Sequence, residues 1–325
     1  ARSTSRDSRD CRGGVRRGRE LGAGPPSPAR PVEIELTSGR IPAQAARVRF
    51  PLGTRKQKRE PGGREQGRGL GLHRLTCDMR FRLLTYNIHK GIGGVDRRYA
   101  PDRIISILRQ YDADIAMLQE VDDGVPRSRH DCQVQLLGDA LDYRYRAYQK
   151  NIRLKSGGYG NAILSRHPLF DVNHVDLSVR MKKRRRALVA HCRLHDGGHS
   201  RRVLLLNVHL GLAGFERVLQ LRRLVASDVF AHTHRQTPVV IAGDFNDVYG
   251  TLGRRTLLPL GFLPAARNQR TFPAVMPLRP LDRIFYRGDV RHCHTFTAHS
   301  GVARQASDHL PLIVDFELEK PTVSE

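Results

Sequence analysis

The stretch Pro238–Gly250, with the sequence PVVIAGDFNDVYG, constrains the fold of this chain more than any other. Its first half is apolar and rich in β-branched residues, which indicates a buried strand. Asp244 and Asn246 follow at once, and they cannot continue the burial because an unpaired charge in a protein core is costly. We therefore expect a core strand that brings a carboxylate and a carboxamide to the mouth of a cleft. The alternative is a simple turn, which Asp and Asn also favour after a strand.

The same pattern recurs in five other stretches, each with Asp, Glu, Asn or His at one end of an expected strand. These stretches are Arg82–Lys90, Ala113–Asp122, Val203–Gly211, Asp282–Tyr286 and Ser307–Phe316. In the last two the polar residues come first and the strand follows. Turns alone do not explain six such strand ends. Converging carboxylates, carboxamides and imidazoles are typical of a divalent-metal site that handles phosphate.

From Met79 onward the expected elements alternate between strands and helices, and we see no internal repeat. The longest expected helix is Phe215–His234, and its inner face is expected to carry the apolar residues Val218, Leu221, Val225 and Val229. The other expectations are helices at Pro101–Gln110 and Cys132–Leu141, a helix or turn at Leu252–Leu260, a hairpin of Ala187–Leu194 with Val203–His209, a loop at Arg270–Leu281, and closing strands near Asp282–Tyr286, His294–His299 and Leu312–Leu318. This order predicts an α/β fold of two mixed sheets packed face to face, with helices outside.

Composition narrows the class of partner. The chain has 325 residues and a formal net charge of +24, which favours an anionic partner such as nucleic acid, phospholipid headgroups or another phosphorylated substrate. Its five cysteines are scattered and form no CxxC pair, so neither a zinc site nor a disulfide framework is indicated, and a reducing compartment fits. No apolar run is long enough for a transmembrane segment, and no signal-peptide core is present. We expect a cytoplasmic monomer, with a peripheral position at a membrane surface as the alternative location.

Residues 1–78 differ from the rest of the chain. They hold 18 Lys and Arg against 8 Asp and Glu, a net charge of +10, and they are rich in Gly, Pro and Ser. Such a segment cannot bury enough apolar surface to offset its ordering entropy, so we expect it to be disordered. A basic nucleic-acid-binding arm is one alternative. Another is that the chain start is misplaced, because Met79 is the first methionine. We assign residues 79–319 to the domain and 320–325 to a tail.

The candidate site residues match the needs of phosphoester hydrolysis, which are charge neutralisation, an activated water and an oriented leaving group. Glu120 is a hard oxygen ligand suited to Mg²⁺, with Mn²⁺ as an alternative, and Asn87 can fix that carboxylate or reach the metal. Asp244 and Asn246 are two residues apart, so both side chains can face the same side. Asp244 can hold or deprotonate a water, and Asn246 can donate a hydrogen bond to a phosphoryl oxygen.

Two histidines are candidates for proton transfer. His309 is the better acid or base, because imidazole titrates near neutrality, and Asp282 is the natural partner to hold its tautomer. His209 is a second imidazole that can donate to the phosphoryl group or act as a general acid. Either His309 or Asp244 would activate the water, and the residues alone do not choose between them.

The motifs YNIHKG, LQEVD, GYGNAILSR, NVHLG, AGDFND, LDRIF and SDHLP occur in this order over Met79–Leu318. Together they resemble the endonuclease/exonuclease/phosphatase superfamily, whose members include DNase I, neutral sphingomyelinases and inositol polyphosphate 5-phosphatases. KKRRRALV and RTFPAVMPLRPLDRIF look closest to uncharacterised bacterial members. The histidine of NVHLG matches the DNase I and sphingomyelinase branches, whereas AP endonucleases carry a different residue there. Abasic-site repair is therefore disfavoured.

The resemblance implies a DNase I-like, four-layered α/β sandwich and Mg²⁺-dependent cleavage of phosphoesters. It implies Glu120 as a metal ligand with Asn87 and Asp308 nearby. It also implies catalytic or phosphate-contacting roles for the remaining set, which is Asp244, Asn246, Asp282, His209 and His309. From the residues themselves, Asn161 is a candidate to line the site or to form a turn, and Arg127 and Arg129 are candidates to grip substrate phosphate.

The substrate is the open part of this interpretation. The basic balance favours a nuclease, but the low aromatic content of 6%, without Trp, provides few side chains to stack on bases. A lipid headgroup or a soluble phosphodiester is the alternative substrate. The rival from another class is a non-catalytic nucleic-acid-binding protein that uses the basic tail and surface, with strongly salt-dependent binding.

Overall fold

The computed structural model describes residues 79–196, 199–266 and 268–318. The expectations for segment 1–78 and for the tail 320–325 concern residues outside these ranges. No helix within the described ranges is long and apolar enough to cross a membrane. The described residues build two six-stranded sheets, and each sheet contains both parallel and antiparallel strand pairs.

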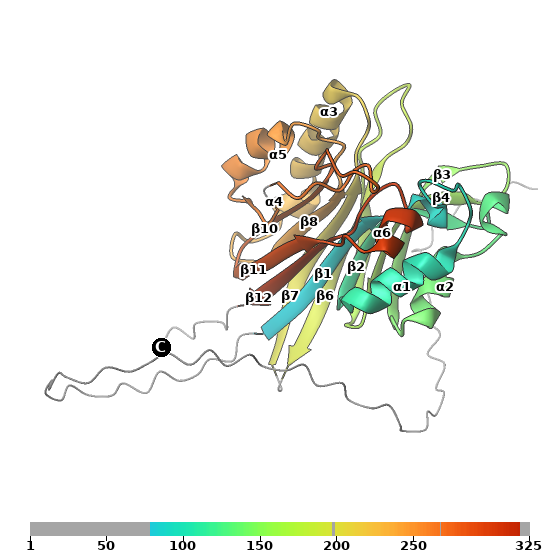
Figure 1. The fold of residues 1–325 in the computed structure, drawn as a ribbon. Coiled ribbons are helices and arrows are strands. Elements are labelled where there is room, and N and C mark those ends of the chain that lie inside the picture. Colours follow the sequence, from blue (N-terminus) through green and yellow to red (C-terminus); the bar gives the residue numbers. More distant parts are fainter. Residues whose placement is uncertain (1–78, 197–198, 267, 319–325) are drawn as a thin grey trace, which may run out of the picture. The chain divides into compact units, whose positions relative to one another are not determined.

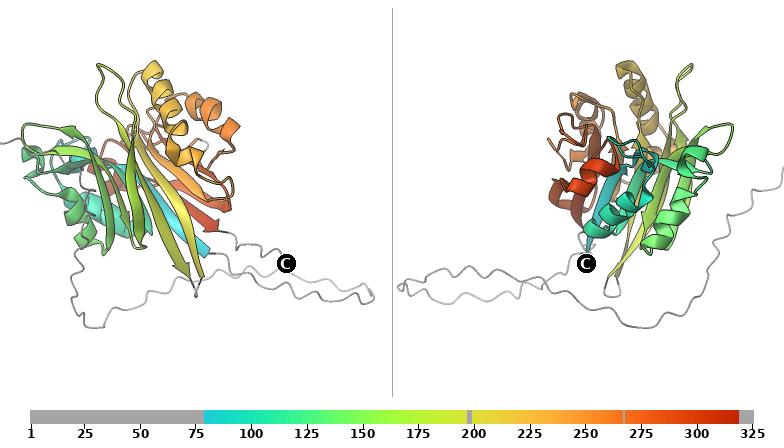
Figure 2. Two further views of the ribbon diagram at one scale, coloured as in Figure 1. Left: turned by 180° about the vertical axis from the view of Figure 1, so that it is seen from behind. Right: turned by 45° about the vertical axis from the view of Figure 1, so that its right-hand side comes forward.

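The strands of the two sheets are drawn in Figures 1 and 2. In spatial order the first sheet is β11 (Val290–Thr297), β12 (Leu312–Leu318), β1 (Met79–Asn87), β2 (Ile115–Asp123), β4 (Gly158–Ser165) and β3 (Tyr145–Arg153). The second sheet is β5 (Leu169–Asp176), β6 (Arg186–Asp196), β7 (His199–His209), β8 (Val239–Asp244), β10 (Asp282–Arg287) and β9 (Leu263–Pro264). The predicted hairpin is β6 and β7, which pair in antiparallel register.

The central strands read as apolar runs because both of their faces are buried. Along β1, Phe81 and Leu83 point into the core between the two sheets, whereas Leu84 and Tyr86 point to the outer face. Leu205 of β7 and Val240 of β8 meet the first pair from the opposite sheet. The two sheets therefore share one dry interface, as the alternation of residues along paired strands requires.

Helices cover both outer faces (Figure 1). The first sheet is covered by α1 (Pro101–Tyr111), α2 (Gln133–Ala140) and α6 (Gly301–Ala306), and the second by α3 (Gly214–Val225), α4 (Asp228–Ala231) and α5 (Thr251–Thr256). Short 3₁₀ turns lie at His89–Gly91, Pro126–Ser128 and Leu258–Leu260. The result is the expected DNase I-like α/β sandwich of four layers.

The prediction of one continuous helix at Phe215–His234 is wrong. The stretch Phe215–His234 forms two helices, α3 and α4, because Ser227 adopts an extended conformation with ψ of 155°. The Ser227 hydroxyl donates a 2.6 Å hydrogen bond to the carbonyl of Leu224 at the end of α3. Such a local side-chain bond to the backbone competes with the hydrogen bonds of a continuous helix. Val218 was predicted to face the core but is 36% exposed, whereas Leu221 is fully buried as predicted.

Two elements had no clear sequence pattern. Strand β5 lies at the edge of its sheet and most of its side chains are exposed, so it lacks the apolar alternation that predicts a strand. Helix α6 is six residues long, and the hydroxyl of Ser300 caps it by accepting a hydrogen bond from the Ala303 amide at 3.2 Å. Helix α6 ends directly before Ser307, which places the segment from Ser307 to His309 at the candidate site.

Candidate active site

Strand direction gathers most of the candidate residues at one edge of the sandwich. His209 is the last residue of β7, Asp244 is the last of β8, and Asp282 is the first of β10. Strand β8 runs parallel to β7 and antiparallel to β10, and the register pairs Asp244 with both His209 and Asp282. Adjacent strands lie about 4.8 Å apart, so these three side chains stand side by side.

Gly243 makes the close pairing of β7 and β8 possible. Its φ of +145° is a conformation that other residues rarely adopt, and a Cβ built there would lie 1.9 Å from the carbonyl oxygen of Val208. The glycine of the AGDFND motif therefore allows β8 to lie close enough to β7 to place Asp244 beside His209. A side chain at residue 243 would push β8 away from β7 and move the carboxylate away from His209.

Asp244 is the centre of the cluster and is 2% exposed. Its Oδ2 accepts a hydrogen bond from Asn87 Nδ2 at 3.1 Å, which connects the end of β1 in the first sheet to the second sheet. Its Oδ1 accepts from the backbone amide of Asn246 at 2.9 Å. Burial raises the pKa of Asp244 above its ordinary value, and the neighbouring carboxylate of Asp282 adds to this, although the charge of His309 acts the other way.

Two imidazoles face Asp244 from opposite sides. His309 Nε2 lies 3.8 Å and His209 Nε2 lies 3.5 Å from Oδ2 of Asp244, which is longer than a typical hydrogen bond. Burial and the charge of Arg185 lower the pKa of His209 well below its ordinary value, so this imidazole is neutral near pH 7. Both Nε2 atoms therefore keep their hydrogen-bonding capacity for a substrate.

His309 makes its second contact with Asp282, as expected from the sequence. Nδ1 of His309 lies 2.8 Å from Oδ2 of Asp282, and Asp282 is fully buried. Burial alone would lower the pKa of His309, but the carboxylates of Asp282 and Asp244 outweigh it and raise this pKa above its ordinary value. The ring of Phe272 packs against the imidazole with centroids 5.0 Å apart, which helps to fix its orientation.

Glu120 occupies an irregular position in β2. The register with β4 shifts between Leu118 and Val121, and Glu120 has a positive φ of 55°, as expected at a β-bulge. Its carboxylate forms an ion pair with the ammonium of Lys90. Burial alone would raise the pKa of Glu120, but the ammonium of Lys90, which forms an ion pair with it, helps to lower this pKa to about 2.

Asp308 and Asn87 are connected through Ser307. The Ser307 hydroxyl donates to the backbone carbonyl of Asn87 at 2.7 Å and lies 3.4 Å from Oδ1 of Asp308. His89 Nδ1 is 3.9 Å from the same carboxylate. Asn87 pairs with Gln119 in the parallel register of β1 and β2, so Glu120 follows directly beside it.

The remaining candidates are Asn246, which lies beside Asp244, and the residues Asn161 and Arg129. Asn246 directs its side-chain amide to the carbonyl of Leu210 at 3.0 Å, so it stabilises the loop after β7. Asn161 is fully buried and donates to the carbonyls of Arg186 and Asn207 at 3.2 and 3.3 Å, inside the sandwich. Arg129 is exposed, and its guanidinium lies over the ring of Tyr99 at 5.8 Å. None of the hydrogen bonds and ring contacts of Asn161 and Arg129 among the described residues reaches Asp244, His309 or Glu120.

Sequence reasoning named Arg127 and the run Lys182–Arg186 as alternatives, but it missed Lys90 and the ring of Tyr159 near Glu120. Lys90 and Arg127 both lie over the ring of Tyr159, at 5.6 and 5.3 Å, and Arg127 is held by the buried carboxylate of Asp122 at 2.8 Å. Arg185 belongs to the run Lys182–Arg186, which favours a solvated loop, yet it is only 6% exposed. No local sequence signal distinguishes it from its neighbours, and its backbone is held by Leu177, whose amide donates to the Arg185 carbonyl at 2.9 Å.

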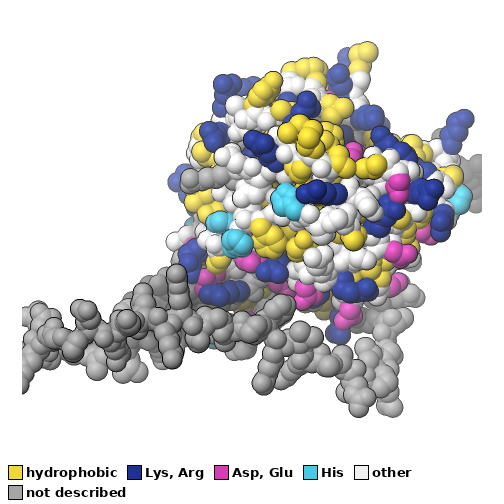
Figure 3. Space-filling model, viewed as in Figure 1, with side chains coloured by type: hydrophobic (Ala, Val, Ile, Leu, Met, Phe, Trp, Pro, Cys, Tyr) yellow, Lys and Arg dark blue, Asp and Glu magenta, His cyan; other side chains and the backbone are white. Residues whose placement is uncertain are grey.

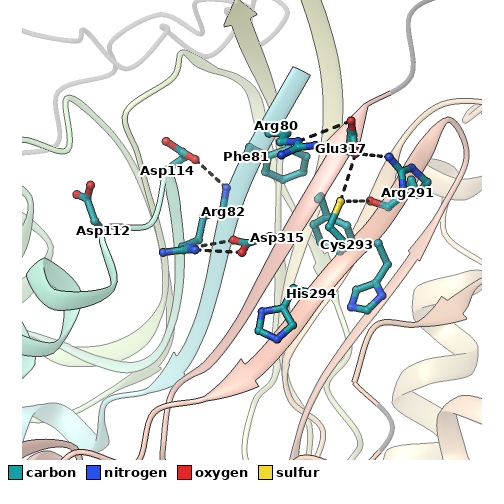
Figure 4. A pocket seen from close by; sticks show the side chains of 12 residues that line it. Arg80, Phe81, Arg82, Asp112, Asp114, Arg291, Cys293, His294, Asp315 and Glu317 are labelled. Atoms are coloured by element: carbon teal, nitrogen blue, oxygen red, sulfur yellow. Dashed lines mark hydrogen bonds and ion pairs between the residues drawn. The ribbon is translucent and has the colours of Figure 1, made fainter. Parts of the chain in front are cut away.

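A separate hollow of about 550 Å³ lies at the other end of the first sheet (Figure 4). Arg82 lines it and is five residues before Asn87 along β1, or about 16 Å at the usual rise of a strand. Its charged groups are largely paired with one another. Arg82 binds Asp315 at 2.7 Å, and Glu317 pairs with Arg80 and Arg291. This hollow therefore shares no residue with the candidate site.

The fold and the cluster at its edge define a DNase I-like sandwich with acids, amides and imidazoles at the strand ends. A sequence model described as the Endonuclease/Exonuclease/phosphatase family matches residues 84–309, and the chain belongs to this family. Enzymes of the family hydrolyse phosphoester bonds and generally use divalent metal ions.

Known proteins agree with this assignment. The chain is 31% identical over 256 residues to the uncharacterized protein YbhP of Escherichia coli K12, and the match covers 75% of this chain and 98% of YbhP. The crystal structure of an endonuclease/exonuclease/phosphatase from Beutenbergia cavernae has a TM-score of 0.60 at 22% identity, with 76% of this chain and 73% of that chain covered. ANGEL2, a 2′,3′-cyclic phosphatase, has a TM-score of 0.57 at 16% identity, with 75% and 97% covered. The two structures show the fold.

Proposed function

We propose that this protein is a Mg²⁺-dependent phosphodiesterase that hydrolyses its substrate by in-line attack of water on phosphorus. The observation that carries the proposal is the buried array in which Asp282 holds His309 and His309 faces Asp244. Asn87 connects this array to the strand end beside Glu120. Membership of a family of phosphoester hydrolases supports it.

The donor set fits a hard divalent cation. Glu120 already holds one cation, the ammonium of Lys90, and its low pKa keeps it ionised across the physiological range. Within the described part of the chain no three His, Cys, Asp or Glu side chains converge to form a complete metal cage. Mg²⁺ accepts such a site, because it binds through one or two carboxylates and keeps several waters. Glu120 would hold the ion, with Asn87 and Asp308 as neighbouring oxygen donors.

When bound, Mg²⁺ supplies positive charge against the phosphoryl oxygens. The side chains of the protein would supply the proton transfers. Asp244 accepts the proton of the attacking water, because its raised pKa brings its basicity closer to neutral pH. His309 is protonated under the influence of Asp282 and Asp244, so it donates from Nε2 to a phosphoryl oxygen instead of acting as the base. His209, neutral and on the other side of Asp244, positions the same phosphoryl group.

The substrate class follows from charge. The formal net charge of +24 favours anionic substrates, such as nucleic acid, phospholipid headgroups or soluble phosphodiesters. On the face drawn in Figure 3, Lys and Arg gather in the upper and right-hand parts, and Asp and Glu lie mostly lower. The candidate from another class is a nucleic-acid-binding protein without catalysis, whose binding would depend on salt but not on Asp244.

The proposal is tested with bis-p-nitrophenyl phosphate and plasmid DNA, in Mg²⁺, in Mn²⁺ and in EDTA, with the full chain and its Asp244→Asn variant. We expect hydrolysis that EDTA abolishes and that Asp244→Asn reduces by about 10²-fold or more. Asp142→Asn, which alters an exposed carboxylate, is the control. Hydrolysis that is equal in EDTA and in Mg²⁺ would contradict the proposal. DNA binding without hydrolysis by the wild type would favour the binding protein.

A further inference from the structure

A second hollow, of about 560 Å³, lies where the end of β3 meets the start of β6. We call it the basic groove and define it by Lys150, Asn151, Arg153, Arg184 and Arg186, which line it. Four of these five residues are basic, and no carboxylate is among the lining residues. Two carboxylates next to the groove offset part of the positive charge: Asp123 binds Lys150 at 2.7 Å, and Asp176 pairs with Arg186 in the β5–β6 register.

The basic groove adjoins the candidate active site through Tyr159. In the first sheet Tyr159 of β4 pairs with Ile152 of β3 on one side and with Asp122 of β2 on the other. Two interstrand spacings of about 4.8 Å separate β3 from β2, so the groove begins about 10 Å from the strand that carries Glu120. Lys90 and Arg127 stand over the Tyr159 ring and extend the positive charge from Glu120 toward the groove.

Several groups in and beside the groove have unused binding capacity. Among the described residues, the guanidinium groups of Arg153 and Arg184 form no ion pair, whereas Lys150 binds Asp123 at 2.7 Å. The Oδ1 atom of Asn151 is buried without a hydrogen-bond partner among those residues, and so is Nε of Arg186. Asn151 is only 5% exposed, so this is a built feature and not a loose surface side chain. Buried polar atoms are rarely left unpaired, which points to a ligand that supplies their partners.

We propose that the basic groove binds a second phosphate group of the substrate, about 10 Å from the strand that carries Glu120. Guanidinium groups bind phosphate with two parallel hydrogen bonds, and the Asn151 carbonyl can accept from a hydroxyl of the attached sugar or polyol. The substrate then carries a phosphate in addition to the one that is cleaved. The neighbouring phosphate of a nucleic acid strand and a second phosphate on a polyol headgroup share this chemistry. The inference rests on the proposed function, because it assigns a subsite to the same active site.

The test separates binding from turnover. Dithymidine monophosphate carries one phosphate, and its 5′- and 3′-phosphorylated forms carry two. Binding of each is measured in EDTA, and turnover is measured in Mg²⁺, for the wild type, for the double variant Arg153→Gln/Arg184→Gln and for Arg222→Gln. Arg222 is an exposed arginine on α3, so its variant shows the effect of removing one arginine charge away from the groove, against two in the double variant. Glycerophosphoinositol and its 4-phosphate are compared in the same way.

We expect the wild type to bind at least one two-phosphate compound about tenfold more tightly than its one-phosphate parent. The preference should fall to about twofold in Arg153→Gln/Arg184→Gln and persist in Arg222→Gln. A preference confined to the dinucleotides identifies a nucleic acid, and one confined to the inositol pair identifies a headgroup. Equal loss in both variants, or no preference in the wild type, overturns the inference. Preference in EDTA without turnover in Mg²⁺ would refute the proposed function and leave the phosphate subsite standing.

Discussion

Nδ1 of His309 lies 2.8 Å from Oδ2 of Asp282, although the two residues are 27 positions apart in the chain. Asp282 begins β10, and His309 stands in the segment between α6 and β12. The pair fixes which ring nitrogen of His309 remains for the substrate, because Nδ1 is committed to the carboxylate and Nε2 faces Asp244. The orientation of His309 therefore depends on Asp282.

Replacing Asp282 with Asn tests the orientation of His309. We expect kcat to fall by about 10²- to 10⁴-fold with little change in KM, since the amide favours the wrong tautomer. Removing the carboxylate also lowers the pKa of His309, so the alkaline limb of the pH–rate profile should move to lower pH. The measurement is a pH profile of kcat/KM against Asp142→Asn as the control. An unchanged alkaline limb would mean that Asp282 does not control His309.

Replacing Glu120 with Gln tests the metal ligand. We expect the affinity for Mn²⁺, measured by electron paramagnetic resonance, to fall by about tenfold or more, because an anionic oxygen is lost. The matched variant is Lys90→Met, which removes the ammonium that competes for the same carboxylate. This variant should bind Mn²⁺ as tightly as the wild type or more tightly. Wild-type affinity in Glu120→Gln would show that the ion is held elsewhere.

Asn207 is expected to matter for stability. Its Nδ2 donates to the carbonyls of Leu118 and Ala162 at 2.9 and 2.8 Å, and its Oδ1 accepts from Gln119 at 2.8 Å, so it ties the two sheets together. Asn207→Leu should lower the free energy of unfolding by about 2–4 kcal/mol, because several buried polar groups lose their partners. Urea denaturation measures this. Asn173→Ala, on the exposed edge strand β5, should change it by less than about 0.5 kcal/mol.

The reactivity of the Cys192 and Cys293 thiols is expected to depend on their burial and on pH. Burial raises the pKa of the Cys192 thiol to about 12, so iodoacetamide at pH 8 should leave it unmodified in the folded protein. Cys293 is exposed and should react, and Cys192 should react once the protein is denatured. Mass spectrometry of the peptides distinguishes the two. Rapid labelling of Cys192 in the native state would contradict its packing between the sheets.

The raised pKa of Cys192 is also expected to make the stability of the protein depend on pH. The folded pKa of Cys192 lies above its unfolded value of about 8.5, so folding favours the protonated thiol. Its contribution is complete below pH 8.5 and is lost as pH rises from there toward 12. Cys192→Ala should therefore show a shallower fall of melting temperature between pH 8.5 and 10.5 than the wild type. An equally steep fall would assign the alkaline destabilisation to other groups.

The fold was predictable because its central strands are buried on both faces. Apolar runs such as VVIAGD and VLLLNVH predict strands. Six such runs with polar residues at one end predict a functional site at the edge of a sheet. The pairing of His309 with Asp282 was also expected, since an imidazole that transfers protons needs a carboxylate to hold its tautomer, and the two side chains are 2.8 Å apart. The fold and family assigned from these motifs are confirmed.

Local patterns fail where distant neighbours decide. Asn207 and Asn246 both come after apolar runs, yet Asn207 lies inside β7, where the packing of the two sheets encloses it, and Asn246 follows β8 and stabilises a loop. Helix α3 ends because a single serine hydroxyl binds the carbonyl of Leu224. A hydropathy pattern contains neither of these contacts.

The surroundings of Glu120 were only partly predictable from the sequence. The sequence alone indicates an acid at the end of β2, but strand register and the bulge bring Lys90 and the ring of Tyr159 to the same place. Arg185 is buried while its neighbours Arg184 and Lys183 are exposed, although all three are chemically alike. The strand order, the polar ends and the excess of positive charge are local properties of the chain. Which of these charges stand together depends on contacts between residues far apart in sequence, and only the packed sandwich sets those contacts.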